Sequence, residues 1–413
     1  MQGIRYWFIA LAVLIASILV TPYFDRHLGL FHARWSLFQH LSETIPPPLQ
    51  PRFIKIVLIG DKERYGSVLH VATPVNRDYL AKLIANLSDK NVPVIALDFD
   101  LRLTLDGATG ALRAYDQIAQ PQRAETGRLM AAIVKAAAHS KIVLANTVGH
   151  GKIRGYSLTP NAYQIYGICV DHDGVWQNPG TKEFPIDQQY AAKRISCGYI
   201  NFPGDMRLIP PRVPLDQGGS IDGFSYAVAY AANPRLVSDL PSNRYFVSFI
   251  RREILEKAVM PAGPIYDDAP GQDITDYIQP IIIGAKWSYS GSGQGDFVDQ
   301  VDTPVGRMSG ALIHAEYSEA ALDGRTYRLI PGWIPQAADY LLAALTAIVF
   351  GLISRISTKI AVFAGIVSGL ILLQLLALHF GAAVFESFVP IFGLLVHSVL
   401  ERMLGLERAH PPV

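Results

Sequence analysis

The chain has 413 residues, of which 50% are hydrophobic and 17% are charged. Its 36 basic and 35 acidic residues nearly cancel, so the formal net charge is +1. A chain with so little net charge offers no general electrostatic attraction to a nucleic acid, and we expect no nucleic-acid partner. The apolar residues are unevenly spread, because long apolar runs lie near both ends and a more polar stretch lies between them.

The first apolar run predicts a membrane anchor. Tyr6 to Phe24 has no charged side chain and is bounded by Arg5 and Asp25, so it is long enough to cross a bilayer as a helix. A cleaved signal peptide is the alternative, but residues 18–23 lack the small-x-small pattern that precedes cleavage. We therefore expect a transmembrane anchor over residues 1–24 and a helical, proline-rich lead-in over residues 25–52.

Strand and helix patterns alternate in the region that follows. Apolar, β-branched runs predict buried strands, and apolar residues three and four apart, with Asn76 as an N-cap, predict helices. The expected elements are a strand at Phe53–Gly60, a helix after Asn76, a strand at Val92–Asp98, a helix at Thr126–His139 and a strand at Lys141–Asn146. This alternation predicts an α/β fold with a mostly parallel sheet flanked by helices.

The second half of the central region is less regular. It predicts a helix at Phe224–Ala232, strands at Tyr245–Ile250 and Ile278–Gly284, and a helix at His314–Leu322. We take residues 53–331 as one extracytoplasmic domain.

Three further apolar runs follow this domain. They are Tyr340–Ile353, Ile360–Leu378 and Ala382–Leu400, and the first becomes long enough to span a bilayer when residues 334–339 are included. We expect three transmembrane helices over residues 332–400 and a short cytoplasmic tail over residues 401–413. With the N-terminal anchor, the predicted membrane region has four helices.

Positive charge near the membrane edges predicts the orientation. Lys and Arg in short loops favour the cytoplasmic side, and the short turn at His379–Gly381 has neither. The basic residues that fall on the other side are Arg5, Arg355, Lys359, Arg402 and Arg408. Both termini are therefore expected in the cytoplasm of a bacterial cell, with the large domain periplasmic or extracellular at the inner membrane.

Small residues form a stripe along one predicted transmembrane helix. Ala361, Gly365 and Gly369 are four residues apart, so they share a face and allow another helix to approach closely. The partner could be a helix of the same chain, another protein or a second copy, which would make a homo-oligomer.

The chain has two cysteines, Cys169 and Cys197, and both lie in the expected extracytoplasmic domain. A disulfide between them could form and persist in that oxidising compartment. The alternative is that both are buried thiols that pack as small hydrophobic residues.

Acidic residues follow two of the predicted strands. Asp98 and Asp100 come at the end of the strand at Val92–Asp98, and three others follow the strand at Ile278–Gly284, namely Asp296, Asp299 and Asp302. If the two strands are neighbours, the carboxylates could converge to bind a ligand, to hold Mg²⁺ or Ca²⁺, or to act as an acid/base pair. The alternative is that Asp98 caps a turn or helix and the others are solvated. We expect no resident cofactor, with Mg or Ca as the alternative.

His314 is a further candidate ligand-binding residue. Together with the acidic residues that follow it, it could form a pH-sensitive pair or help to bind a cation. The alternative is a histidine at a helix start that bonds to the backbone. Neither a serine nor a cysteine falls in a nucleophile-elbow pattern, so we do not expect an enzyme.

Four segments carry a resemblance to a known family. They are residues 56–60, residues 94–99, residues 198–207 and the stretch from Ile282 to Gly324, which includes Asp302-Thr303-Pro304 and His314-Ala315-Glu316. In these segments the chain resembles the CHASE type 2 domain, an extracytoplasmic sensory domain associated with bacterial cyclases and histidine kinases. The resemblance implies a sensory domain over most of residues 53–331, with one membrane helix before it and about three after it.

The chain departs from that family at its C-terminal end. Members often continue into a cytoplasmic cyclase or kinase domain, whereas only Glu401–Val413 follow the last apolar run. We therefore expect a membrane-anchored sensor that acts through a separate signalling or envelope protein. The alternatives are a structural scaffold subunit of a cell-envelope complex and a periplasmic metal-dependent enzyme.

Overall fold

The structure is a computed structural model of the whole chain. It describes residues 54–66, 69, 75–99, 101, 120–146, 194–200, 211–214, 220–237, 245–247, 249–250, 252–269, 278–288, 300–303, 305–329, 341, 353, 356–381 and 383–384. The chain divides into two compact units, one of residues 46–326 and one of residues 1–45 with residues 327–413. The predicted N-terminal anchor, lead-in and cytoplasmic tail lie outside the described residues.

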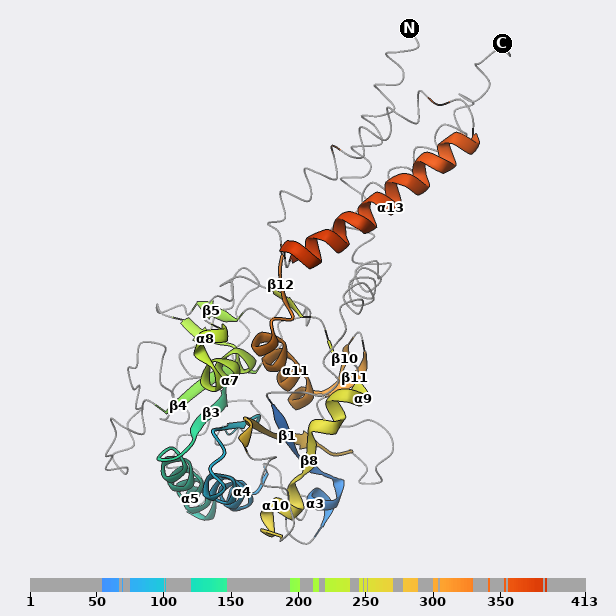
Figure 1. Cartoon of the computed structure of the whole chain (residues 1–413). Coiled ribbons are helices and arrows are strands. Elements are labelled where there is room, and N and C mark those ends of the chain that lie inside the picture. Colours follow the sequence, from blue (N-terminus) through green and yellow to red (C-terminus); the bar gives the residue numbers. More distant parts are fainter. Residues whose placement is uncertain are drawn as a thin grey trace, which may run out of the picture. The chain divides into compact units, whose positions relative to one another are not determined.

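A six-stranded sheet lies at the centre of the 46–326 unit (Figure 1). Its strands are β1 (Lys55–Gly60), β2 (Val94–Leu97), β3 (Lys141–Asn146), β4 (Ile195–Tyr199), β8 (Val259–Pro261) and β9 (Ile281–Lys286). The spatial order is β4-β3-β2-β9-β1-β8, and every neighbouring pair is parallel. The prediction of an α/β fold with a mostly parallel sheet is confirmed.

Helices cover both faces of this sheet (Figure 1). The α4 face is the side covered by α4 (Arg77–Asp89), α5 (Gln120–Ala136) and α10 (Ala262–Tyr266). The α11 face is the side covered by α7 (Phe224–Ala232) and α11 (Gly310–Asp323). Because successive side chains of a strand point to opposite faces, each strand supplies apolar side chains to both layers.

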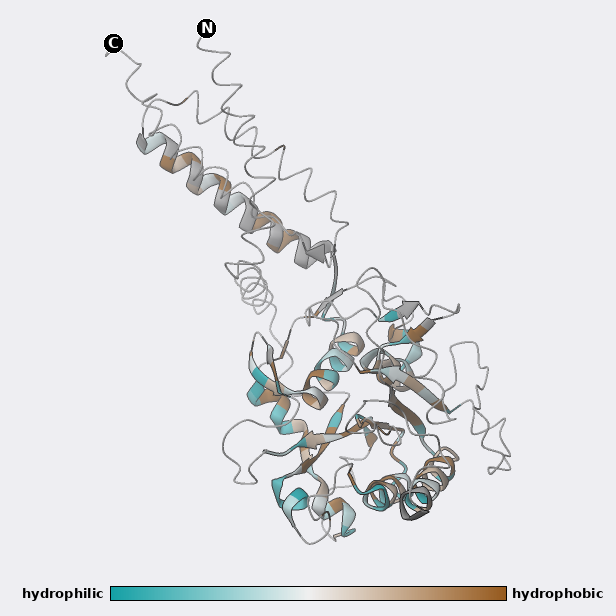
Figure 2. Cartoon of the chain, turned by 180° about the vertical axis from the view of Figure 1, so that it is seen from behind, coloured by the Kyte–Doolittle hydropathy of each residue, from teal (hydrophilic) through white to brown (hydrophobic). Residues whose placement is uncertain are grey.

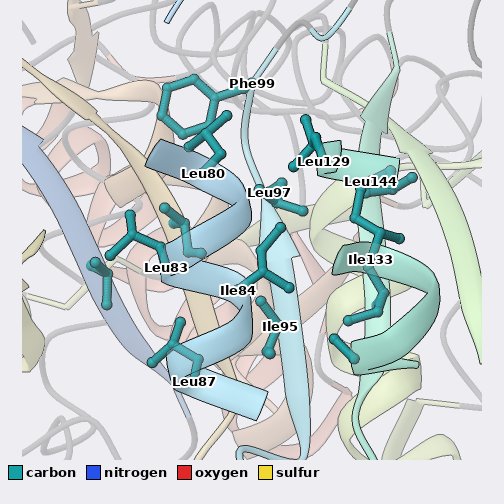
Figure 3. Packing of buried hydrophobic residues seen from close by; sticks show 14 of the residues in the cluster. Leu80, Leu83, Ile84, Leu87, Ile95, Leu97, Phe99, Leu129, Ile133 and Leu144 are labelled. Atoms are coloured by element: carbon teal, nitrogen blue, oxygen red, sulfur yellow. The ribbon is translucent and has the colours of Figure 1, made fainter. Parts of the chain in front are cut away.

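An apolar core fills the α4 face (Figure 3). Asn76 begins α4, since its Oδ1 accepts hydrogen bonds from the backbone N–H groups of Asp78 and Tyr79 at 2.9 and 3.2 Å. The helix then presents Leu80, Leu83, Ile84 and Leu87 to Ile95 and Leu97 of β2, and to Leu129 and Ile133 of α5. Hydrophilic residues lie on the outer surfaces of α4 and α5 (Figure 2), as expected for helices with one buried face.

Shorter elements complete this unit. Two antiparallel pairs join β5 (Arg212–Pro214) to β6 (Ser220–Asp222) and β10 (Gln300–Thr303) to β11 (Gly306–Ser309). The remaining elements are α3 (Asp61–Tyr65), α8 (Pro234–Val237), β7 (Tyr245–Val247), α9 (Arg252–Leu255) and the 3-10 helix η3 (Glu256–Ala258).

Several element boundaries differ from the predicted ones. α5 begins at Gln120 rather than Thr126, because a proline such as Pro121 is tolerated in the first turn of a helix. β9 begins at Ile281 rather than Ile278, after Pro280, which has no N–H to donate. α11 begins at Gly310 rather than His314, so His314 lies in the second turn and is not at the helix start.

In the second unit the structure describes one long helix, α13 (Ile356–Gly381), and a short parallel pairing of β12 (Thr326–Leu329) with β13 (Ala383–Val384). Ala361, Gly365 and Gly369 lie on α13 and are exposed. Within the described ranges, no helix qualifies as a membrane span by length and apolar character. The four predicted transmembrane helices stay predictions.

Candidate functional site

Asp98 lies at the carboxyl end of the central sheet. It directly follows β2, and its backbone N–H continues the strand pairing by donating to the carbonyl of Ile283 on β9 at 2.9 Å. Alternation along the strand turns its side chain toward the α11 face, where only 7% of it is exposed. The sequence therefore places a carboxylate inside the protein at the end of a buried strand.

A glycine on β9 lets α11 approach this carboxylate. A Cβ atom on Gly284 would lie 2.2 Å from the Cβ of Ala311 and 3.6 Å from Asp98 Oδ2. The first of these distances is far below van der Waals contact, so only glycine fits here without movement of the helix. The close approach brings the next turn of α11, with His314, toward Asp98.

His314 lies beside Asp98. Nε2 of His314 is 3.9 Å from Asp98 Oδ1, which is too long for a hydrogen bond. Burial lowers the pKa of His314 to about 3, against a smaller opposing effect of a hydrogen bond to the backbone of Ile200. The imidazole is therefore neutral near pH 7.

The other ring nitrogen of His314 contacts α7. Its Nδ1 is 2.9 Å from the hydroxyl oxygen of Ser225, and its ring meets the ring of Phe224 edge-on with centroids 5.1 Å apart. The second strand-to-helix approach also needs a glycine, because a Cβ on Gly198 would lie 2.3 Å from the Cα of Phe224. We call Asp98, Ser225 and His314 the Asp98 cluster.

The Asp98 cluster contains the residue types of a catalytic triad but not its geometry. A triad needs a nucleophile that substrate can reach and a carboxylate that is hydrogen-bonded to the imidazole. Ser225 is 2% exposed, and the carboxylate lies 3.9 Å from the ring nitrogen. The cluster is therefore suited to fixing the position of α11 against β2 and α7, and not to nucleophilic attack through Ser225.

The cluster lies where the chain topology changes direction. The helices that come after β1 and β2 in the chain, α4 and α5, lie on one face of the sheet. Strand β9 lies between β1 and β2 in the sheet, and the helix that comes after it, α11, lies on the other face. In open α/β sheets, ligands bind in the crevice outside the carboxyl ends of strands at such a switch point. Asp98 and Gly284 lie at this point, on neighbouring strands.

A second group of charged residues lies on the opposite side of α11. Glu316 Oε1 accepts hydrogen bonds from the backbone N–H of Ile250 and from Arg325, both at 2.7 Å. Asp323 Oδ2 accepts a further hydrogen bond from Arg325 at 2.6 Å. We call Glu316, Asp323 and Arg325 the Arg325 clamp.

The Arg325 clamp is an ion-pair group around one buried carboxylate. Burial raises the pKa of Glu316, against the opposing effect of Arg325. Glu316 is fully buried, and 11% of the Arg325 side chain is exposed. Burial works to lower the pKa of Arg325, but the carboxylates of Glu316 and Asp323 raise it above its ordinary value, so the guanidinium stays charged.

The structure describes only part of the predicted ligand site. Asp98 and His314 lie close together, as given above. Asp302 lies on β10 opposite Arg307, and its side chain is not described. Asp100, Asp296 and Asp299 lie outside the described residues, so the predicted convergence of carboxylates stays a prediction. Within the described ranges, no group of three His, Cys, Asp or Glu side chains is placed to hold a metal ion.

Two further sequence predictions concern other residues. Cys197 on β4 is disulfide-bonded, but its predicted partner Cys169 lies outside the described residues, so this pairing stays a prediction. Glu316, one of the acidic residues that follow His314, contacts Ile250 and Arg325.

Sequence reasoning missed Ser225 and Arg325. The sequence does contain a signal for both, because α11 is buried on all sides and yet carries His314, Glu316, Ser318 and Glu319. Buried polar side chains need hydrogen-bonding partners. The pattern therefore predicts partners on neighbouring elements, although it does not identify them.

The sequence model of the CHASE2 domain matches residues 9–353, which is most of the chain. No curated protein and no solved structure matches the chain significantly.

Proposed function

Because the chain belongs to the CHASE2 domain family, we propose that it is a membrane-anchored sensor that binds a ligand at the Asp98 cluster and acts through a separate partner protein. The CHASE2 family is an extracytoplasmic sensory domain, so the chain is a sensory module in general terms. The ligand site, the membrane anchoring and the partner are the parts that we propose.

One observation carries the ligand site: a buried carboxylate lies at the switch point of an open α/β sheet. Asp98 has little solvent around it, and His314 beside it is neutral. A carboxylate in such surroundings interacts more strongly with a polar or cationic group than it would in water. A ligand that reached this carboxylate would also meet α11, which packs on Gly284.

Sensing requires that the ligand prefers one of two arrangements of the domain. Asp98 is followed by Phe99, which packs in the core of the α4 face, while His314 and Ser225 belong to helices of the α11 face. A ligand between these elements would contact both, and its affinity would depend on their separation. This gives the Asp98 cluster a means of converting binding into a change of helix position.

The test of the ligand site uses the full chain purified in mild detergent. Mass spectrometry would identify small molecules that stay bound, and thermal unfolding would be followed with a fixed panel of amino acids, amines, carboxylates, phosphates and sugars. We expect Asp98→Asn to lower the affinity for the bound molecule at least about tenfold, which is about 1.4 kcal/mol of binding free energy. The variant should therefore retain less of that molecule and show a smaller thermal shift with it.

The matched control is Asp268→Asn, since Asp268 is an exposed carboxylate paired with Lys90 at 2.6 Å. It should bind as the unaltered chain does. A ligand that binds equally well to Asp98→Asn and to Asp268→Asn would contradict the proposed site. A chain that carries no small molecule and responds to no member of the panel would contradict ligand sensing and favour the scaffold alternative.

Membrane anchoring is supported by the apolar runs of the sequence. α13 contains the whole run Ile360–Leu378, and its Ile360, Leu372, Leu373 and Leu376 side chains are exposed by 63, 57, 51 and 44%. A large exposed apolar surface on a helix is typical of a site that contacts lipid or another protein.

The test of this topology is a set of reporter fusions. A green fluorescent protein placed after Val413 should fluoresce, because the C-terminus is expected in the cytoplasm. An alkaline phosphatase placed after Pro331 should be active, because the domain is expected outside. The reverse result at either position would contradict the proposed orientation.

A sensory domain has to pass its state to an effector, and we propose that the effector is a separate protein. Crosslinking in native membranes followed by purification and mass spectrometry should recover one protein in stoichiometric amount. Recovery of this chain alone, under conditions that preserve a known membrane complex of the same cells, would contradict the proposal.

A further inference from the structure

Helix α11 links the Asp98 cluster to the point where the chain leaves the 46–326 unit. The residues that face the sheet and α7 are Ala311, His314 and Ser318, which are three and four residues apart and therefore share a face. Glu316 lies on the opposite side of the helix, since two residues correspond to about 200° of rotation from His314. One rigid helix thus contacts the site with one face and the Arg325 clamp with the other.

The contacts on the sheet-facing side are specific. Ser318 donates a hydrogen bond to the backbone carbonyl of Ser225 at 2.8 Å, and His314 contacts the Ser225 side chain. Residues 310–322 are all buried. A packed helix of this kind moves as a unit and does not deform gradually.

The other sides of α11 contact two segments, residues 249–250 and the turn at residues 323–325. Phe249 packs edge-on against Tyr317, on the flank of the helix, with ring centroids 5.7 Å apart. The Ile250 amide donates to Glu316, on the side opposite His314. Arg325 is held by its side chain in the clamp and by its amide, which donates to the carbonyl of Ala320 at 2.9 Å. Gly324, between the last residue of α11 and Arg325, has a φ of +78°, so the helix ends in a sharp turn that glycine permits.

The Arg325 clamp lies next to the point where the chain leaves the 46–326 unit. Arg325 is two residues before Tyr327, where the second unit begins. A displacement of α11 would move Glu316 and with it the end of the 46–326 unit. Because an ion pair in a buried site depends strongly on its geometry, a small movement of Glu316 changes how firmly Arg325 is held.

We propose that α11 is the transmission element of this sensor, and that Glu316 and Arg325 pass changes at the Asp98 cluster to the chain segment that leaves the domain. The inference rests on the proposed function for the identity of the signal. Glu316 and Arg325 are positioning residues in this scheme, since neither contacts the Asp98 cluster.

The test is hydrogen–deuterium exchange of the full chain in mild detergent, with no ligand added. The reporters are the backbone amides of Ile250 and of residues 324–327. We expect His314→Asn, or the milder Ser225→Ala if that variant does not fold, to raise their exchange at least about tenfold, since local opening sets the exchange rate. In Glu316→Gln the same amides should already exchange fast, and adding His314→Asn should change them less than twofold.

The control is Leu83→Ala, which removes a core side chain on the α4 face and leaves α11 untouched. It should raise exchange first in α4 and not preferentially at the reporters. The proposal would be overturned if His314→Asn affected only α7 and residues 310–318, if its effect were undiminished in the Glu316→Gln background, or if Leu83→Ala gave the same pattern.

This experiment is independent of the ligand-binding test. If Asp98→Asn kept full ligand affinity while His314→Asn changed the reporters, the proposed ligand site would fail and the transmission through α11 would stand. If Asp98→Asn lost the ligand while His314→Asn left the reporters unchanged, the proposed ligand site would stand and the transmission through α11 would fail.

Discussion

On the α4 face of the sheet, leucine and isoleucine side chains fill the space between helices and strands, whereas the helix on the other face, α11, buries a histidine, two glutamates and a serine. Apolar packing tolerates rearrangement, because similar contacts can be remade after a small shift. A buried polar group is stable only while its partners stay in place. The difference indicates that the α4 face maintains the fold, while the α11 face selects one arrangement and so is suited to sensing.

The largest effect is expected from breaking the Arg325 clamp. Arg325→Met leaves the buried carboxylate of Glu316 and the partly buried carboxylate of Asp323 without their cation, and should lower the free energy of unfolding by about 3–5 kcal/mol. Urea unfolding of the detergent-purified chain, followed by tryptophan fluorescence, measures this loss. The control is Arg252→Met, which breaks the half-exposed pair with Glu256 and should cost no more than about 1 kcal/mol. Equal losses in the two variants would remove the distinction between the clamp and a surface pair.

Truncation of a core leucine tests the α4 face. Leu83 is fully buried between α4 and the sheet, so Leu83→Ala removes apolar contacts and leaves a cavity that costs about 2–5 kcal/mol. The same substitution at Leu236, which is 48% exposed on α8, should change stability by no more than about 0.5 kcal/mol. Urea unfolding again provides the measurement. A Leu83→Ala variant as stable as Leu236→Ala would contradict the assigned core.

Two glycine substitutions separate close packing from backbone flexibility. Gly284→Ala places a Cβ against Ala311, so α11 has to move and the expected loss is about 1–3 kcal/mol. Gly127 lies inside α5 with nothing within 4 Å of its would-be Cβ, so Gly127→Ala should stabilise the chain by roughly 0.5–1 kcal/mol. Thermal unfolding of the two variants should therefore shift in opposite directions. A neutral Gly284→Ala would show that α11 is free to move away from β9.

The sequence predicted the α4 face better than the α11 face, for a physical reason. Strand β2 and helix α4 follow from periodic apolar residues such as Leu80, Leu83 and Leu87, whose pattern is local. Ser225 and His314, in contrast, contact each other across 89 residues of sequence. No local pattern pairs two polar side chains at that separation, so the partner of His314 became known only from the structure.

The candidate site was predicted in part for the same reason. Asp98 could be assigned to a strand end because an apolar run stops there, and the switch point follows from the sheet order. The sheet order itself places β9 between β2 and β1, although β9 comes almost last in the sequence. The position of a late strand between two early ones depends on tertiary packing and not on local sequence. The apolar run of β9 is compatible with any central position in the sheet.

The most specific effect is expected from the pH dependence of stability. His314 has its pKa lowered from 6.5 to about 3 by burial, so below pH 6.5 the unfolded chain binds a proton that the folded chain does not. This contribution to stability is therefore fully present above pH 6.5 and is lost as the pH falls toward 3, by up to about 1.4 kcal/mol for each pH unit. The range from pH 6.5 to 5 is the clearest, because ordinary carboxylates titrate mostly below it.

The measurement is the free energy of unfolding of the unaltered chain and of His314→Asn at several pH values between 7 and 5. The variant should be less stable at pH 7, because it loses the contact with Ser225, but its stability should fall less steeply with pH. An unchanged slope in His314→Asn would mean that this histidine accepts a proton in the folded state as readily as in the unfolded state. The α11 face would then be open to solvent near Asp98, and its contrast with the α4 face would rest on the Arg325 clamp alone.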